Sequence, residues 1–161
     1  MRKIILFSAM LILCASLTSC DMINRISSGK TDATVGDKTE GSKIEESGAI
    51  ATLISADSTS ATIKIENNTD STWQSGNMRD YSLEVEKDGE WYQVNQIGEY
   101  ANTMELMIFA PGESITHRFS FVERYGNLTP GKYRVVKAYW ANKTVTSDAH
   151  EFHVVCEFTV E

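Results

Sequence analysis

The stretch from Tyr81 to Val94 reads YSLEVEKDGEWYQV and decides the fold class. Apolar and polar residues alternate over 81–85, which is the pattern of a strand with one face on a core and the other in water. Asp88-Gly89 follows, and a second strand-like segment begins at Trp91. Because glycine adopts positive φ at little cost, this pair favours a tight turn, and the stretch predicts a β-hairpin.

The same period-two alternation continues on both sides of the hairpin, and no window carries a helical stripe. Segments 60–66 and 149–160 alternate strictly, whereas 104–109 is apolar on both faces, which predicts a buried strand. The number and spacing of the segments predict an all-β sandwich of about seven to nine antiparallel strands. The expected strands are 50–55, 60–66, 81–87, 90–96, 104–109, 114–122, 132–140 and 149–160.

The 161 residues carry 15 Lys and Arg against 22 Asp and Glu, a formal net charge of −7. This length indicates one domain with an appendage. The acidic balance argues against nucleic acid as a partner, because such binding rests on clustered Lys and Arg.

The N-terminus has the features of an export signal. Arg2 and Lys3 precede an apolar run over 4–13, which is too short to span a bilayer. The run ends in Leu17-Thr18-Ser19-Cys20, which resembles the lipobox of bacterial lipoproteins. The resemblance implies cleavage between Ser19 and Cys20 and a diacylglyceryl thioether on the cysteine. Two acyl chains would hold the protein stably at the extracytoplasmic face of the cell membrane. Ordinary secretory cleavage, with Cys20 incidental, is the alternative.

The organisation expected along the chain is a signal peptide over 1–19, a flexible lipid-anchored linker over 20–48 and a folded domain over 49–161. The linker contains no aromatic residue and is rich in Ser, Thr, Gly and mixed charge, which is typical of a tether. Only Cys20 and Cys156 remain after cleavage, and lipidation would consume the first. We therefore expect no internal disulfide.

Four segments carry a family resemblance: Glu66–Thr69, Lys87–Tyr92, Pro111–Ser114 and Leu128–Lys137. In their order and spacing they are similar to the bacterial Ig-like domains found on lipoproteins of Gram-positive bacteria, over roughly residues 48–161. The resemblance implies an immunoglobulin-like sandwich and brings no catalytic residues, so we expect a protein that is not an enzyme.

Two positions fit that fold. Tyr133 follows a Pro-Gly corner and has the placement of a tyrosine corner, whose hydroxyl bonds to nearby backbone. Val135 stands where an antibody domain has its second cysteine, and no cysteine lies near Ile63 or Ile65, so an aliphatic contact is expected instead. Trp91 is a candidate packing residue.

Few residues indicate chemistry. Cys156 lies on an apolar strand face, which predicts a core thiol rather than a nucleophile. Glu84 and Glu86 are expected to be solvated strand charge. A metal is not expected, because His150 and His153 would point to opposite faces of one strand, and no cofactor is expected. The residues with metal-ligating side chains are His117, His150, His153, Glu151 and Glu157.

Binding or positioning of an envelope component is the favoured function, and its aromatic candidates are residues that core or edge packing would equally explain. Trp73, Tyr100 and Trp140 are the candidate contacts, in loops that also hold Asn77 and Asn142. The partner would be an envelope protein or a cell-wall glycan. A structural spacer without a ligand and an envelope enzyme are the alternatives.

Overall fold

The computed structural model describes residues 31–39, 48–98, 105–142 and 150–161. This part of the chain contains ten strands and one short helix. Their bounds are β1 Val35–Lys38, β2 Ala49–Ala56, β3 Ser60–Asn67, β4 Thr72–Ser75, β5 Ser82–Lys87, β6 Glu90–Val94, β7 Met107–Phe109, β8 Ser114–Ser120, α1 Val122–Tyr125, β9 Gly131–Asn142 and β10 His150–Val160.

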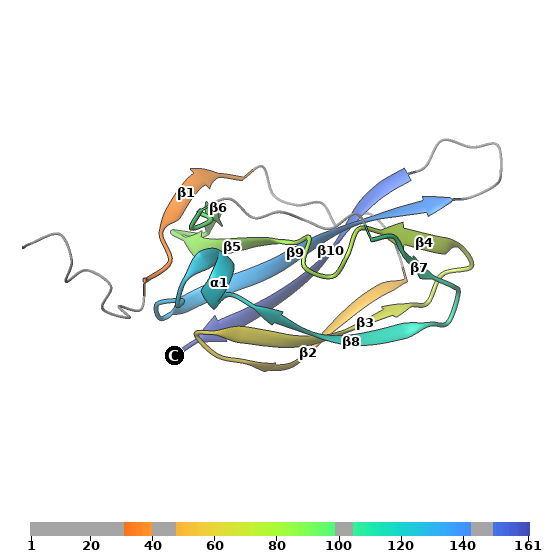
Figure 1. The fold of residues 1–161 in the computed structure, drawn as a ribbon, viewed down its shortest axis with the longest axis horizontal. Helices are drawn as coiled ribbons and strands as arrows, with labels where there is room; N and C mark the ends of the chain where they lie inside the picture. The colour runs from red at the N-terminus through yellow and green to blue at the C-terminus, as the bar shows by residue number, and fades with distance from the viewer. Residues whose placement is uncertain (1–30, 40–47, 99–104, 143–149) are drawn as a thin grey trace, which may run out of the picture.

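The strands form two antiparallel sheets. The smaller sheet has the order β2-β3-β8, and the larger has the order β1-β6-β5-β9-β4-β7, with β10 on the other side of β9. The long strand β9 pairs with β5 through Val136 and with β4 through Asn142, so it joins both halves of the larger sheet. Figure 1 shows the two layers, with β1, α1 and the C-terminus at one end of the domain.

The hydrophobic core lies between the sheets and confirms the predicted sandwich. The smaller sheet contributes Ile63 and Ile65, and the larger contributes Val135. Trp73 packs edge-on against Phe152 with the ring centroids 5.0 Å apart. Such burial is the main stabilising contribution in a domain held together by packing.

Both predicted turn features are confirmed. Asp88 and Gly89 have φ values of 54° and 80°, and the hairpin joins Lys87 to Glu90 across the turn. The Tyr133 hydroxyl donates a 2.8 Å hydrogen bond to the backbone carbonyl of Thr129, which is the contact of a tyrosine corner.

The prediction of a flexible linker over 20–48 is wrong for its middle part. Val35 in β1 pairs with Val94, and the backbone N–H of Ala33 donates to the carbonyl of Asn127. A sheet edge pairs through backbone groups, so this strand needs no apolar alternation and gives little signal in the sequence. Gly126, at φ 85°, lets the chain pass closely: a Cβ there would collide with the carbonyl of Thr31.

The segment over 104–109 also differs from its prediction. Only Met107–Phe109 forms a strand, and it lies at the edge of the larger sheet with β4 as its partner. Its outer face is uncovered among the described residues, because the Ile108 side chain is 60% exposed. The strand expected over 114–122 ends at Ser120, where the chain turns into α1. Neither β4 nor α1 was predicted, since both are only four residues long.

Candidate functional site

The aromatic residues expected to contact a partner do not form one surface. Trp73 is fully buried, so its prediction as a surface contact is wrong: β4 turns its ring into the core, where Nε1 donates to the Thr69 hydroxyl at 3.1 Å. Trp140 is partly exposed, and its Nε1 donates to Glu151 at 3.2 Å. Tyr100 lies outside the described residues.

The other residues predicted to form sites have different outcomes. Ser19 and Cys20, the predicted cleavage and lipidation residues, lie outside the described part of the chain. Asn77 is buried rather than displayed. Cys156 is a buried free thiol, as predicted, and burial together with the nearby Glu157 charge raises its pKa to about 11. A thiol with this pKa stays protonated near neutral pH and reacts slowly.

The histidines are spread over two strands. His117 lies half-buried on β8, whereas His150 is exposed at the start of β10. His153 is 3.6 Å from Glu151. Within the described ranges, no three His, Cys, Asp or Glu side chains come together as a metal site.

An ion pair lies on the outer face of the larger sheet, where the sequence predicted solvated charge. Arg134 Nε donates to Glu84 at 2.6 Å, and these residues are only 6% and 4% exposed. The ring of Trp91 covers the guanidinium, with its centroid 4.2 Å from Cζ. Trp91 therefore packs, as predicted, but over this ion pair rather than in the core. Glu84 is buried because the bulky Trp91 and Arg134 stand on the same face.

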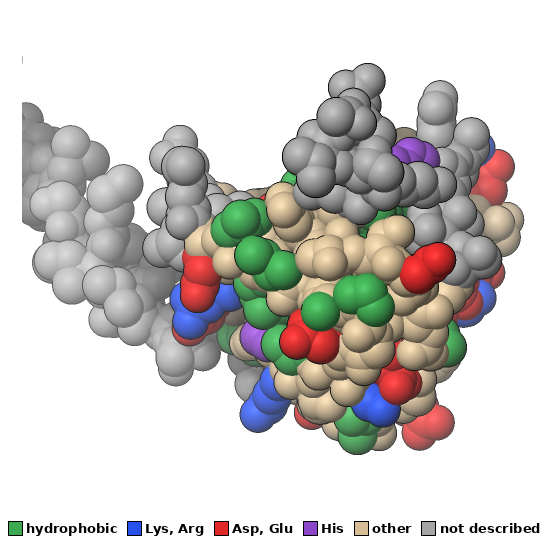
Figure 2. Space-filling model, turned by 90° about the vertical axis from the view of Figure 1, so that its right-hand side faces the viewer, with side chains coloured by type: hydrophobic (Ala, Val, Ile, Leu, Met, Phe, Trp, Pro, Cys, Tyr) green, Lys and Arg blue, Asp and Glu red, His purple; other side chains and the backbone are tan. Residues whose placement is uncertain are grey.

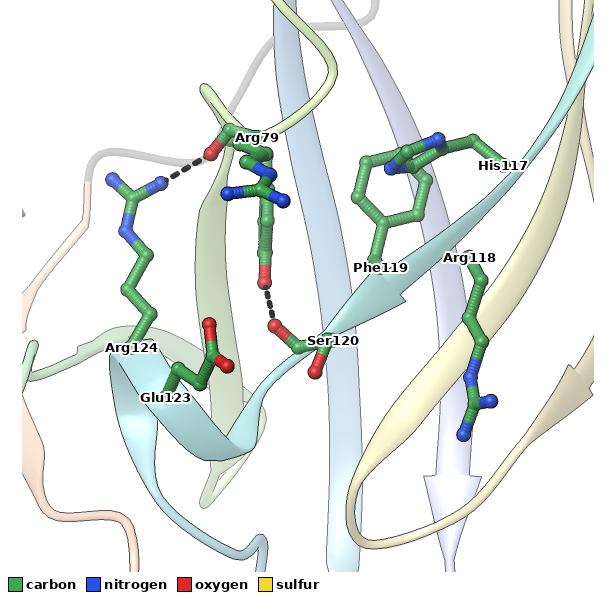
Figure 3. A pocket seen from close by; sticks show the side chains of 8 residues that line it. Arg79, His117, Arg118, Phe119, Ser120, Glu123 and Arg124 are labelled. Atoms are coloured by element: carbon green, nitrogen blue, oxygen red, sulfur yellow. Dashed lines mark hydrogen bonds between the residues drawn. The ribbon is translucent and has the colours of Figure 1, made fainter. Parts of the chain in front are cut away.

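A hollow of about 270 Å³ opens between β8, α1 and the loop that joins β4 to β5. Figure 3 shows Arg79 and His117 at the top of this view, with Ser120 and Glu123 below them. The residues that line the hollow are Arg79, Tyr81, His117, Arg118, Phe119, Ser120, Glu123 and Arg124.

Two buried cations hold the loop that carries Arg79. Lys137 on β9 donates from Nζ to the carbonyls of Asn77 and Asp80, both at 2.9 Å. Arg124 on α1 donates from Nη1 to the carbonyl of Arg79 at 2.6 Å. Lys137 is 1% exposed, and this burial lowers its pKa to about 8. The loop backbone is thus fixed from below, which positions the Arg79 side chain.

The walls of the hollow are fixed by aromatic residues. Tyr81 bridges the sheets by donating from its hydroxyl to the carbonyl of Ser120 at 2.7 Å. Tyr125 donates to the carbonyl of Tyr81 at 3.0 Å, and burial raises its pKa to about 12. The His117 ring meets Phe119 edge-on at 4.8 Å.

Positive charges outnumber negative ones around the hollow. The pKa of His117 is lowered first by burial and then by the positive charges of Lys137 and Arg79. The lining contains three arginines and one acid, Glu123, although the whole chain is acidic. The face shown in Figure 2 carries acidic, basic and hydrophobic side chains at scattered positions.

The three arginines have different roles. Figure 3 shows the Arg124 guanidinium turned toward the carbonyl of Arg79, and Arg118 directed away from His117. Arg118 Nε instead donates to the Ser60 hydroxyl at 3.1 Å. Arg79 is an exposed residue on the loop 76–81 and lines the hollow from that side.

Sequence reasoning missed this hollow. Its residues come from 79–81 and 117–124, which are far apart in the chain. The one available signal was the segment 117–124, HRFSFVER, which concentrates two arginines and a histidine in an acidic chain.

The two packed antiparallel sheets, the tyrosine corner and the core without a disulfide define an immunoglobulin-like β-sandwich. The model of the bacterial Ig-like domain family matches residues 51–153, and the chain belongs to this family. Comparisons with curated proteins and with solved structures gave no significant match. Membership supports an extracellular module that is not an enzyme. No helix in the described ranges is long and apolar enough to cross a membrane.

Proposed function

We propose that this protein is a lipid-anchored Ig-like module that binds an envelope component at the extracytoplasmic face of the cell membrane. Its partner is an envelope protein or a cell-wall glycan, and the cationic hollow between β8, α1 and the loop 76–81 is the contact site. The proposal assigns it a binding and positioning role without catalysis.

The anchor rests on the lipobox-like Leu17-Thr18-Ser19-Cys20. Asp32, twelve residues beyond Cys20, already pairs with Asn127 of the domain. A fully extended chain of this length spans at most about 40 Å. Lipidation of Cys20 would therefore keep the end of the domain that holds β1 and α1 close to the membrane.

The observation that carries the binding role is the fixed loop beneath Arg79. The domain buries Lys137 and Arg124 to hold the carbonyls of this loop. Burying a cation costs free energy unless it is well hydrogen-bonded. Holding the loop 76–81 in one conformation with two buried cations therefore carries a desolvation cost. Rigid sandwiches commonly carry recognition on loops held in this manner.

Affinity capture tests the proposal. The full chain with Cys20→Ser would be immobilised and exposed to solubilised membrane proteins and wall fragments of the native host. Three forms are compared: the Cys20→Ser chain alone, the same chain with Arg79→Gln, and the same chain with Lys87→Gln. Lys87 is exposed on the β5–β6 hairpin, so its variant matches the charge change outside the hollow.

Saturable enrichment that Arg79→Gln abolishes and Lys87→Gln leaves intact is the expected result. Enrichment that both variants retain would refute the hollow as the contact site. If none of the three forms enriched anything above an unrelated sandwich domain, the protein would act as a spacer and the binding role would be wrong.

A further inference from the structure

We infer that the hollow binds the phosphate ester of a polyol, with Arg79 and His117 contacting the phosphate and Glu123 contacting the hydroxyl groups. The inference rests on the proposed function and names the ligand chemistry of the same site. The shared chemical group is a glycerol phosphate unit, whether it belongs to a lipid headgroup or to a soluble or wall-bound ester.

The charge of the lining selects an anion. Arg79 is an exposed residue of the lining, and Arg124, which is buried, lines the hollow from α1. Lys137 adds a third positive charge below the loop and makes no contact with the opening. The arginines of the lining outnumber its one acid, so the hollow attracts a negative group.

The geometry favours phosphate over carboxylate. Guanidinium groups present several N–H donors in a fixed fork that suits phosphate oxygens. His117 approaches from a different strand, β8, and Ser120 lies on the same wall as a hydroxyl donor. A tetrahedral group accepts hydrogen bonds from several directions at once, whereas a planar carboxylate accepts them in one plane.

The one acid in the lining, Glu123, indicates that the ligand carries hydroxyl groups beside its phosphate. Figure 3 shows the Glu123 carboxylate below Arg79, on α1. A second anion beside a bare phosphate would repel it, but a carboxylate accepts hydrogen bonds from hydroxyl groups. A ligand with phosphate at Arg79 and hydroxyls at Glu123 satisfies both. The volume of about 270 Å³ is large enough for such a group.

The position of the hollow places both sources of this chemistry within reach. It is lined by α1, which lies at the same end of the domain as β1 (Figure 1). The anchor of the proposed function attaches to that end of the domain through Asp32. Membrane headgroups and envelope polymers with phosphate esters would both be accessible.

NMR titration of the full chain with Cys20→Ser tests the inference. The probes are glycerol 1-phosphate, inorganic phosphate and acetate at constant ionic strength, and the readout is the ring signal of His117, assigned with a His117→Asn variant. Glycerol 1-phosphate should shift this signal saturably and raise the pKa of His117, because an anion favours the imidazolium. Glu123, Arg79, Arg118 and Lys137 are the other charged groups around this ring.

Two variants in the same Cys20→Ser chain separate the site from general electrostatics. Arg79→Gln should weaken glycerol 1-phosphate binding at least about tenfold, as expected for the loss of a charge-assisted hydrogen bond. Lys87→Gln should change it less than about twofold, since exposed and distant charges are screened by salt. Glu123→Gln should reduce the ratio of the affinity for glycerol 1-phosphate to the affinity for inorganic phosphate.

Vesicles distinguish the two sources. Cosedimentation with phosphatidylglycerol vesicles that depends on Arg79 would identify the lipid headgroup, and binding of glycerol 1-phosphate alone would identify a soluble or wall ester. Equal binding of acetate, no saturable shift of His117, or full binding by Arg79→Gln would overturn the inference. If a partner were still captured through Arg79 in those cases, the proposed function would stand and only its ligand chemistry would be wrong.

Discussion

Replacing Arg134 by methionine should strongly destabilise the domain. The change removes a guanidinium that donates to Glu84 at 2.6 Å and leaves the carboxylate buried, since Glu84 is only 4% exposed. Breaking a buried ion pair from one side typically costs about 3–5 kcal/mol. The contact of Arg134 with Trp91 adds about 0.5–2 kcal/mol. We expect Arg134→Met to lower the free energy of unfolding by about 4 kcal/mol.

Replacing both partners should cost much less. In Glu84→Leu/Arg134→Met no charge is left without a partner, and apolar replacement of a buried pair is often neutral or better. We expect the double variant to lie within about 1 kcal/mol of the parent. The difference between Arg134→Met and the double variant would then measure the penalty of leaving Glu84 without its partner.

Urea denaturation followed by both circular dichroism and tryptophan fluorescence measures these free energies on the full chain with Cys20→Ser. Lys132→Met is the matched control, because Lys132 lies two residues earlier on the same face of β9 and forms exposed ion pairs with Glu86 and Glu157. Exposed pairs contribute about 0–1 kcal/mol. A loss below about 1 kcal/mol in Arg134→Met, equal to that of the control, would refute the reasoning.

Three further predictions concern single residues. Gly126→Ala should place a Cβ against the Thr31 carbonyl and accelerate amide hydrogen exchange at Ala33, whose N–H bonds to Asn127; unchanged exchange would contradict the close approach. The pKa of Lys137 in the folded protein, about 8, lies below the ordinary value of 10.5 because the side chain is buried, so the unfolded chain binds more protons between these values. The free energy of unfolding should therefore rise with pH across this window relative to Lys137→Met, and urea titrations below, within and above the window check the sign. Cys156 should react with a thiol reagent only as fast as the domain opens, and rapid modification of the folded protein would contradict its burial.

Local patterns predicted the fold well where one strand face meets the core. The hairpin at Asp88-Gly89 needs positive φ at both residues, and the sequence places a glycine there. The tyrosine corner at Tyr133 depends on a carbonyl only four residues away, so it too is visible in a short segment. The alternation in β3 and β10 reports burial on one face directly.

The burial of a side chain by residues from distant strands was not predictable. Glu84 alternates with apolar residues and reads as solvent-facing, yet Arg134 from β9 and Trp91 from β6 bury it. Trp73 was a candidate surface contact in a segment where no strand was predicted, but strand pairing of β4 with β7 and β9 turns it inward. Neighbours that arrive from distant strands decide such positions, and a single sequence does not show them.

The candidate site illustrates the same limit. The hollow joins Arg79 from one loop to His117 and Glu123 from another region, and Lys137 holds it from a third. Each of these residues is unremarkable in its own segment. The contacts of Tyr81 with Phe119 and Ser120 of β8, together with the bonds from Lys137 to the loop, bring them together.

The lipid anchor at Cys20 is tested most directly by the intact mass and location of the protein in its native host. The full chain and its Cys20→Ser variant would be expressed there, fractionated into membrane and soluble material, and weighed by mass spectrometry. The wild type should begin at Cys20, carry a diacylglyceryl group and sediment with membranes, whereas Cys20→Ser should be released. A wild-type mass without acyl chains, or a Cys20→Ser variant that still sediments with membranes, would contradict the lipid anchor.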